Sequence, residues 1–135
     1  MTVAINSQTG HGMLVIDIAG EATAEHCLGS IANPEGVDVL ILEAFLYIIT
    51  AAGLASTLHV GVGTVGADSH DLTDGVALNN TAGTCWNGMH PVAADAAMTT
   101  PAVWTAETFL NFTTAAQVST GAVAKYFVRY VRLED

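Results

Sequence analysis

The segment Val37–Thr50, VDVLILEAFLYIIT, is the most apolar stretch of the chain and decides the fold class. It is rich in β-branched and aromatic residues, which favour an extended backbone. A helix is the competing interpretation, because periodicity alone does not settle a short apolar run. We favour a strand whose two faces are both largely apolar. Such a strand is either covered on both sides or presents one face to a partner.

Alternation assigns the side chains of this strand to two faces. The face with the aromatic residues carries Val39, Ile41, Glu43, Phe45, Tyr47 and Ile49. The opposite face carries Leu40, Leu42, Ala44, Leu46 and Ile48. A single sandwich needs only one of these faces for its core, so the other is available for a partner.

The next segment, Leu54–Gly63 (LASTLHVGVG), also has the alternation of a strand. Its apolar positions, Leu58, Val60 and Val62, alternate with His59 and Gly61. Only a short turn that contains Gly53 separates it from Val37–Thr50. We therefore expect the two segments to pair as a β-hairpin.

Further strands are predicted towards both ends of the chain, at Gly12–Gly20, Gly121–Asp135 and, more weakly, Ala106–Thr114. In the first, the clean apolar face carries Leu14, Ile16 and Ile18, opposite Met13, Val15 and Asp17. In the last, one face carries Tyr126, Val128 and Tyr130, and the other carries Lys125, Phe127, Arg129, Val131 and Leu133. Short strands without a convincing amphipathic helix predict an all-β sandwich of the jelly-roll type.

The segment 76–104 has Gly, Asn and Pro punctuation and no sustained period, which is typical of a long irregular loop. A loop of this length in a small domain is usually functional or ordered by a partner. The 135 residues otherwise suit a single domain, residues 1–135, with one core.

Gly61, Gly63 and Gly66 have the G-x-G-x-x-G spacing of a dinucleotide-binding turn. That motif needs a following helix and an acidic residue about twenty positions later, and the sequence has neither. We interpret the glycines as residues that relax a strand end or a bulge. No cofactor is expected.

Asp68, Asp71 and Asp74 follow at every third position, unlike the alternate acids of a calcium-binding EF-hand loop. An irregular calcium site is the alternative to a solvated acidic loop, which we favour. The five histidines form no i, i+4 pair, and no metal site is expected.

Cys85 precedes His90 by five residues, and a thiol nucleophile with a histidine base is therefore conceivable. Cys27 and Cys85 are too few for a disulfide framework and fit no zinc spacing, although one disulfide between them is possible. Because no catalytic constellation is evident, the protein is not expected to be an enzyme.

Charge excludes several classes of partner. The chain has 13 acidic and 3 basic side chains, a formal net charge of -10, and its three bases are Lys125, Arg129 and Arg132. Phosphate contacts need clustered bases, so nucleic acid is an improbable ligand and an anionic membrane surface is disfavoured. No apolar run reaches the roughly twenty residues of a membrane-spanning helix.

The order of these motifs resembles small virion proteins of tailed bacteriophages, of the head decoration or cement type. The similar features are an aromatic strand ending in Thr50, then Leu-x-Val-Gly-Val-Gly from Leu58, then Asp-Leu-x-Asp-Gly from Asp71, then the strand Tyr126–Val131. The resemblance covers about half of the chain, and the loop 79–104 has no counterpart in it.

This resemblance implies a jelly-roll or β-sandwich protein on the outer surface of a capsid, where it stabilises the shell by self-association, commonly as a trimer, and by contacts with the major capsid protein. The interface residues are expected on the surplus strand face (Phe45, Tyr47 and Ile49), at the tryptophans Trp86 and Trp104, and in the basic cluster Lys125, Arg129 and Arg132. The alternative is a small-molecule or glycan-binding β-sandwich module of a phage head or tail, with its site at Trp86, His90 and Trp104.

Overall fold

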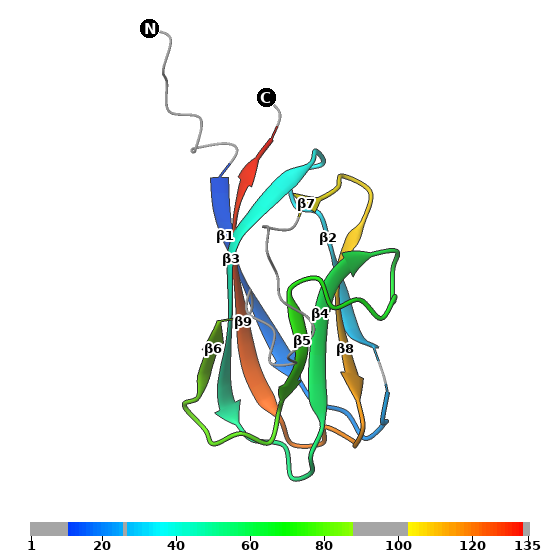
Figure 1. Ribbon diagram of the computed structural model, residues 1–135, viewed down its shortest axis with the longest axis vertical. Helices are drawn as coiled ribbons and strands as arrows, with labels where there is room; N and C mark the ends of the chain where they lie inside the picture. The colour runs from blue at the N-terminus through cyan, green and yellow to red at the C-terminus, as the bar shows by residue number, and fades with distance from the viewer. Residues whose placement is uncertain (1–10, 26, 88–102, 134–135) are drawn as a thin grey trace, which may run out of the picture.

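The structure is a computed structural model and describes residues 11–25, 27–87 and 103–133. These residues form two antiparallel β-sheets packed face to face, with no helix among them (Figure 1). The strands are β1 His11–Ala19, β2 Cys27–Ala32, β3 Val39–Thr50, β4 Thr57–Gly63, β5 Thr73–Ala77, β6 Cys85–Asn87, β7 Val103–Trp104, β8 Phe109–Ala115 and β9 Val123–Arg132.

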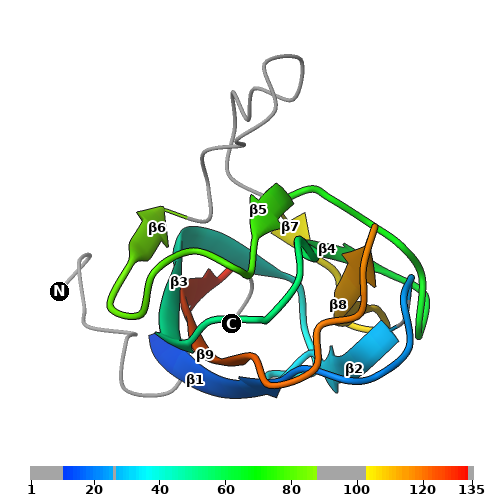
Figure 2. The ribbon, with the colours of Figure 1, turned by 90° about the horizontal axis from the view of Figure 1, so that it is seen from below.

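One sheet has the order β1-β9-β3-β6, with the short β7 also paired to β3, and the other has the order β2-β8-β4-β5. Figure 2, which looks along the strands, shows these two layers side by side. The chain crosses repeatedly between them, in the order of a jelly roll. The predicted all-β sandwich with jelly-roll topology is therefore confirmed. Within the segment expected to be an irregular loop, the structure places the end of β5, all of β6 and β7, and leaves 88–102 outside the described residues.

The predicted hairpin between the second and third sequence segments is wrong, because β3 and β4 lie in different sheets. β3 pairs with β9 over almost its whole length, and β4 pairs with β8 and β5. The connecting residues Ala52 and Ser56 instead exchange backbone hydrogen bonds with Leu78. Each strand has one buried apolar face, and two such faces bury more surface when they oppose each other across a core than when they share one ribbon.

The predicted faces of β3 also need correction, because the strand contains a β-bulge at Leu42. The register with β9 shifts between Ile41 and Glu43. A bulge adds one residue and reverses the alternation that follows it. Val39 and Ile41 therefore face the core before the bulge, while Ala44, Leu46 and Ile48 face it afterwards.

The faces predicted for β1 and β9 are confirmed. Leu14, Ile16 and Ile18 pack on or within the core, while Met13, Val15 and Asp17 are exposed. Tyr126, Val128 and Tyr130 are buried.

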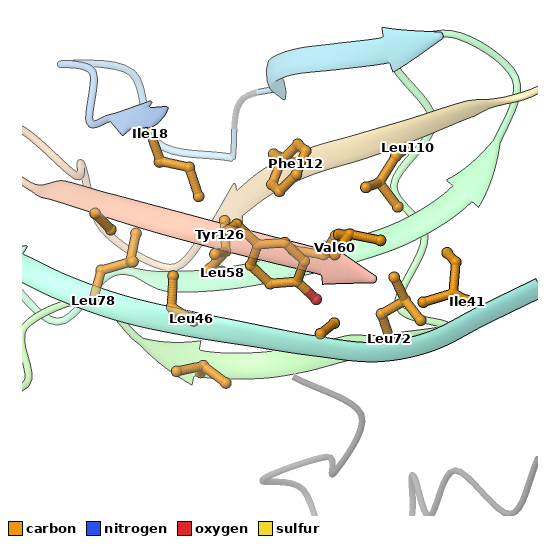
Figure 3. Close-up of a cluster of buried hydrophobic side chains, with 14 of the residues drawn as sticks. Ile18, Ile41, Leu46, Leu58, Val60, Leu72, Leu78, Leu110, Phe112 and Tyr126 are labelled. Atoms are coloured by element: carbon orange, nitrogen blue, oxygen red, sulfur yellow. The ribbon is translucent and has the colours of Figure 1, made fainter. Parts of the chain in front are cut away.

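Tyr126 lies near the middle of the core, between the two sheets (Figure 3). Its ring packs edge-to-face on Phe112, with centroids 5.3 Å apart. Its hydroxyl is 2.8 Å from Thr73 Oγ1, so the polar group is hydrogen-bonded across the sandwich. The other large side chains of this core include Ile41, Leu46, Leu58, Val60, Leu72, Leu78 and Leu110.

Replacing Tyr126 by Phe is expected to change the alkaline stability of the protein. Burial raises the pKa of Tyr126 above its usual value of 10.0. The hydroxyl of Tyr126 therefore ionises at a lower pH in the unfolded chain than in the folded protein. Its contribution to the free energy of unfolding is complete below about pH 10 and is lost as the pH rises through the folded pKa. Tyr126→Phe removes the bond to Thr73 and is expected to cost about 1 kcal/mol near neutral pH.

Urea unfolding of both proteins from pH 8 to pH 11 measures the effect. The wild type is expected to lose stability more steeply above about pH 10 than the variant does. Tyr130, whose pKa burial raises to about 12, is present in both proteins and cancels in the comparison. Parallel pH profiles would contradict the assignment.

Candidate functional site

The side of the β2-β8-β4-β5 sheet that points away from the core is covered in part by the chain itself. The segment 64–72, which joins β4 to β5, turns back over this sheet. Asp68 accepts a hydrogen bond from Thr113 Oγ1 at 2.8 Å, and the backbone NH of Gly66 donates to Asn111 Oδ1 at 3.1 Å. Ser69 Oγ also donates to the carbonyl of Val62 at 3.1 Å. The polar groups of this segment that are named here thus have hydrogen-bond partners within the chain.

Gly61 explains how this segment comes so close to β4. A Cβ at Gly61 would lie 2.4 Å from Ser69 Oγ and 2.6 Å from the Ser69 carbonyl carbon. Gly66 has a φ of 78°, which favours glycine at the turn. The G-x-G-x-x-G spacing therefore serves close packing and a turn, and the described chain after β4 folds back onto the sheet.

The outer face of the β1-β9-β3 part of the other sheet is apolar and partly exposed. The strand registers place Val15, Phe127 and Phe45 in one row across β1, β9 and β3. Met13 and Val15 are each 56% exposed, although both are large apolar residues on a regular strand. We call this surface the outer face; its apolar members are Met13, Val15, Phe45, Tyr47, Ile49, Val123 and Phe127.

Two ion pairs flank the apolar row on the outer face. Lys125 Nζ lies 2.6 Å from Asp17 Oδ1 in the neighbouring row on one side. On the other side, Arg129 contacts Glu43 with both Nη2, at 3.1 Å, and Nε, at 3.2 Å. The hydrogen bond and charge of Arg129 lower the pKa of Glu43. The outer face is therefore neutral in charge, within a chain whose net charge is -10.

The structure divides the predicted interface residues between several places. Phe45 is half-buried on the outer face, and Tyr47 and Ile49 are exposed there. Lys125 and Arg129 are also on this face, but they pair with acids of their own chain. Arg132 is at the end of β9, on the alternate side of the strand, so the three bases do not form one cluster.

The two tryptophans lie in different strands, Trp86 in β6 and Trp104 in β7. Trp104 is fully buried, and its Nε1 donates to the carbonyl of Thr108 at 3.1 Å. It is a core residue, so the prediction that it forms an exposed interface or a sugar platform is wrong. β6 places the backbone of Trp86 opposite Leu46, but its side chain lies outside the described residues, as does His90.

The described part of the chain has two surface hollows, and the larger one has the size of a ligand pocket. The smaller, of about 200 Å³, lies between β1 and β2 and is lined by residues such as Ile16 and Leu28. The larger, of about 370 Å³, lies beside segment 64–72 and is lined by residues such as Asp68 and Thr113. Ligand pockets are typically about 300–1,000 Å³ and carry several convergent polar groups. Cys27 and Cys85 are free thiols on strands of different sheets, so the possible disulfide does not form.

The three aspartates of segment 64–75 do not form one carboxylate cluster. Asp71 Oδ2 accepts from the backbone NH of Val62 at 3.0 Å, while Asp68 bonds Thr113. Asp74 lies beside His59 and His70 instead. The sequence analysis missed this histidine pair, because the two residues are eleven positions apart and meet only where segment 64–72 folds back.

Sequence analysis also missed half of the outer face. Met13 and Val15 were placed correctly as outward residues of β1, but they were not combined with Phe45 and Phe127. The available signal was a large apolar residue at outward positions of three separate strands.

No protein-family model, curated protein or solved structure matches this chain. None of the described segments forms a helix long and apolar enough to cross a membrane.

The different burial of Trp104 and Tyr47 gives a direct test of these assignments. Trp104→Ala is expected to lower the free energy of unfolding by about 3–5 kcal/mol, because it leaves a large cavity. Tyr47→Ala removes an outer cross-strand contact and is expected to cost at most about 1 kcal/mol. Urea denaturation of dilute protein measures both losses. Similar losses for the two variants would contradict the placement.

Proposed function

We propose that this chain is a structural virion protein that decorates a bacteriophage capsid and self-associates through the outer face of the β1-β9-β3 sheet. The observation that supports this most is the apolar row of Val15, Phe127 and Phe45, which lies outside the core and whose members are exposed or only half-buried. Large exposed apolar patches on a small domain mark interaction sites. The motifs that resemble phage decoration proteins supply the virion context.

A second copy of this chain is the occupant that the charges favour for the outer face. Two molecules of net charge -10 repel each other at most orientations. The outer face carries two of the three bases of the chain, each balanced by an acid. Contact through this face therefore buries apolar surface without adding like charges to the interface.

The arrangement of side chains on the outer face also suits an interface. Aromatic and aliphatic groups lie at the centre, and the ion pairs Lys125–Asp17 and Arg129–Glu43 flank them. In protein interfaces, central apolar anchors supply most of the affinity, and charges near the rim guide the register. The assembled form, with a trimer favoured, would then attach to the major capsid protein at the outer surface of the shell.

Self-association is tested with Val15→Glu, which adds a charge at the centre of the outer face. Sedimentation equilibrium is expected to show an oligomer for the wild type and a monomer for the variant, because a buried unpaired carboxylate is costly. Val65→Glu is the matched control: Val65 is 68% exposed in the turn after β4, away from the outer face, and this variant is expected to remain oligomeric. Circular dichroism checks that all three proteins are folded.

A wild type that stays monomeric at all concentrations would overturn the self-association. So would a Val15→Glu variant that assembles as the wild type does.

Attachment to capsids is tested by adding the purified protein to assembled phage heads that lack a decoration protein. Wild-type protein is expected to sediment with the heads at a fixed ratio to the capsid subunits. Val15→Glu is expected to bind more weakly, because single subunits lose the gain from multiple linked contacts. Failure of the wild type to bind the heads of any candidate host phage would contradict the capsid role while leaving self-association standing.

A further inference from the structure

Four side chains with metal-ligating atoms meet on the opposite sheet from the outer face. His59 comes from β4, Asp74 from β5, and Asp68 and His70 from segment 64–72. One ligand atom from each of His59, Asp68 and His70 can be chosen so that all three lie within 4.8 Å of one another. Asp74 Oδ1 is 3.2 Å from Nδ1 of His59 and 3.6 Å from Nδ1 of His70.

We propose that these four residues bind a divalent transition-metal ion, for which Zn²⁺ is the natural probe. The two Nδ1 atoms are 2.9 Å apart, so they form with Asp74 Oδ1 a triangle whose edges are 2.9, 3.2 and 3.6 Å. With metal–ligand bonds of about 2.0–2.1 Å, tetrahedral geometry puts neighbouring ligand atoms about 3.3 Å apart. Two edges of the triangle, 2.9 and 3.2 Å, are shorter than this spacing, and the third, 3.6 Å, is longer.

Every placement of protons leaves one pair of these three atoms facing each other without a hydrogen bond. If His59 Nδ1 carries the proton, it donates to Asp74 and to the lone pair of His70, and those two acceptors face each other at 3.6 Å. If His70 Nδ1 carries it instead, the lone pairs of His59 and Asp74 oppose each other at 3.2 Å. If both nitrogens are protonated, two N–H groups oppose each other at 2.9 Å. A cation at the centre of the triangle interacts favourably with all three lone pairs at once.

The ligand types select the class of metal. Two imidazoles with carboxylates suit zinc, copper, nickel or iron, whereas calcium and magnesium prefer oxygen ligands alone. Asp68 supplies the fourth candidate ligand, because one of its carboxylate oxygens lies within 4.8 Å of ligand atoms of both histidines. The site is open to solvent, because the side chain of His70 is 49% exposed.

Gly61 is what allows His70 to reach His59. Because Gly61 has no side chain, segment 69–71 lies directly on β4, with the backbone N of Asp71 2.8 Å from where a Cβ would stand. A bound metal would therefore link segment 64–72 to two strands of the sheet. Its role would be to hold this segment in place, because a ligand that binds only the folded state stabilises it by mass action.

The test uses the full chain without a histidine tag. Titration calorimetry is expected to show one Zn²⁺ per chain, and Co²⁺ is expected to give the intense visible absorption of a tetrahedral site. Calcium and magnesium at the same concentrations are expected not to compete. A hundredfold excess of Zn²⁺ over Kd is expected to raise Tm by roughly 5–10 °C.

His59→Ala and His70→Ala are each expected to lower the Zn²⁺ affinity at least about tenfold, since each removes a ligand. His11→Ala, in β1 of the other sheet, removes a histidine without touching the site and is expected to bind as the wild type does. If an alanine variant does not fold without metal, the corresponding glutamine variant, His59→Gln or His70→Gln, is measured in its place because it keeps a polar side chain.

No Zn²⁺ binding by the wild type would overturn the proposal. So would unchanged binding in either histidine variant, or an equal loss in His11→Ala. These outcomes are independent of self-association, which concerns the other sheet.

Discussion

The pairing of β9 with β1 and β3 is the constraint on which the rest of the structure depends. β9 lies between these two strands, and its alternating side chains must point either into the sandwich or away from it. Tyr126 and Val128 fill the core on one side. Phe127 therefore points outward, in the same row as Val15 and Phe45. The same pleat that completes the core thus exposes apolar surface on the other side of the sheet.

The two outer surfaces of the sandwich differ in what covers them. Over β4 and β8, segment 64–72 forms hydrogen bonds to Thr113 and Asn111, and Gly61 permits its close approach. The outer face of β1, β9 and β3 has no such cover among the described residues, and its apolar groups are exposed or half-buried. In a chain with so few charges, exposure of this surface lowers solubility, and the proposed association with another copy would remove that cost. We propose a metal site on the first surface and a protein interface on the second.

Sequence alone predicted the strands and faces of β1 and β9 well, because a period of two between glycines is a local signal. The partners of β3 and β4 were mispredicted, since nearness in sequence favours a hairpin while the actual pairing with β9 and β8 is long-range. The bulge at Leu42 could not be predicted, because the sequence around it contains no glycine or proline. Trp104 was misassigned because it follows a segment without periodicity and sits in a strand of only two residues. The meeting of His59 and His70 depends on the path of a turn, which spacing does not encode.

The central claim is that the outer face is buried by another copy of the chain, and hydroxyl-radical footprinting of the wild type tests it most directly. Met13 is a sensitive probe at the margin of this face, and Val65 reports on exposed surface elsewhere. The account predicts that oxidation of Met13, Tyr47 and Phe127 falls as the protein is concentrated, while oxidation of Val65 does not change. Equal oxidation of Met13 at low and high concentration, or protection of Val65 in its place, would contradict it.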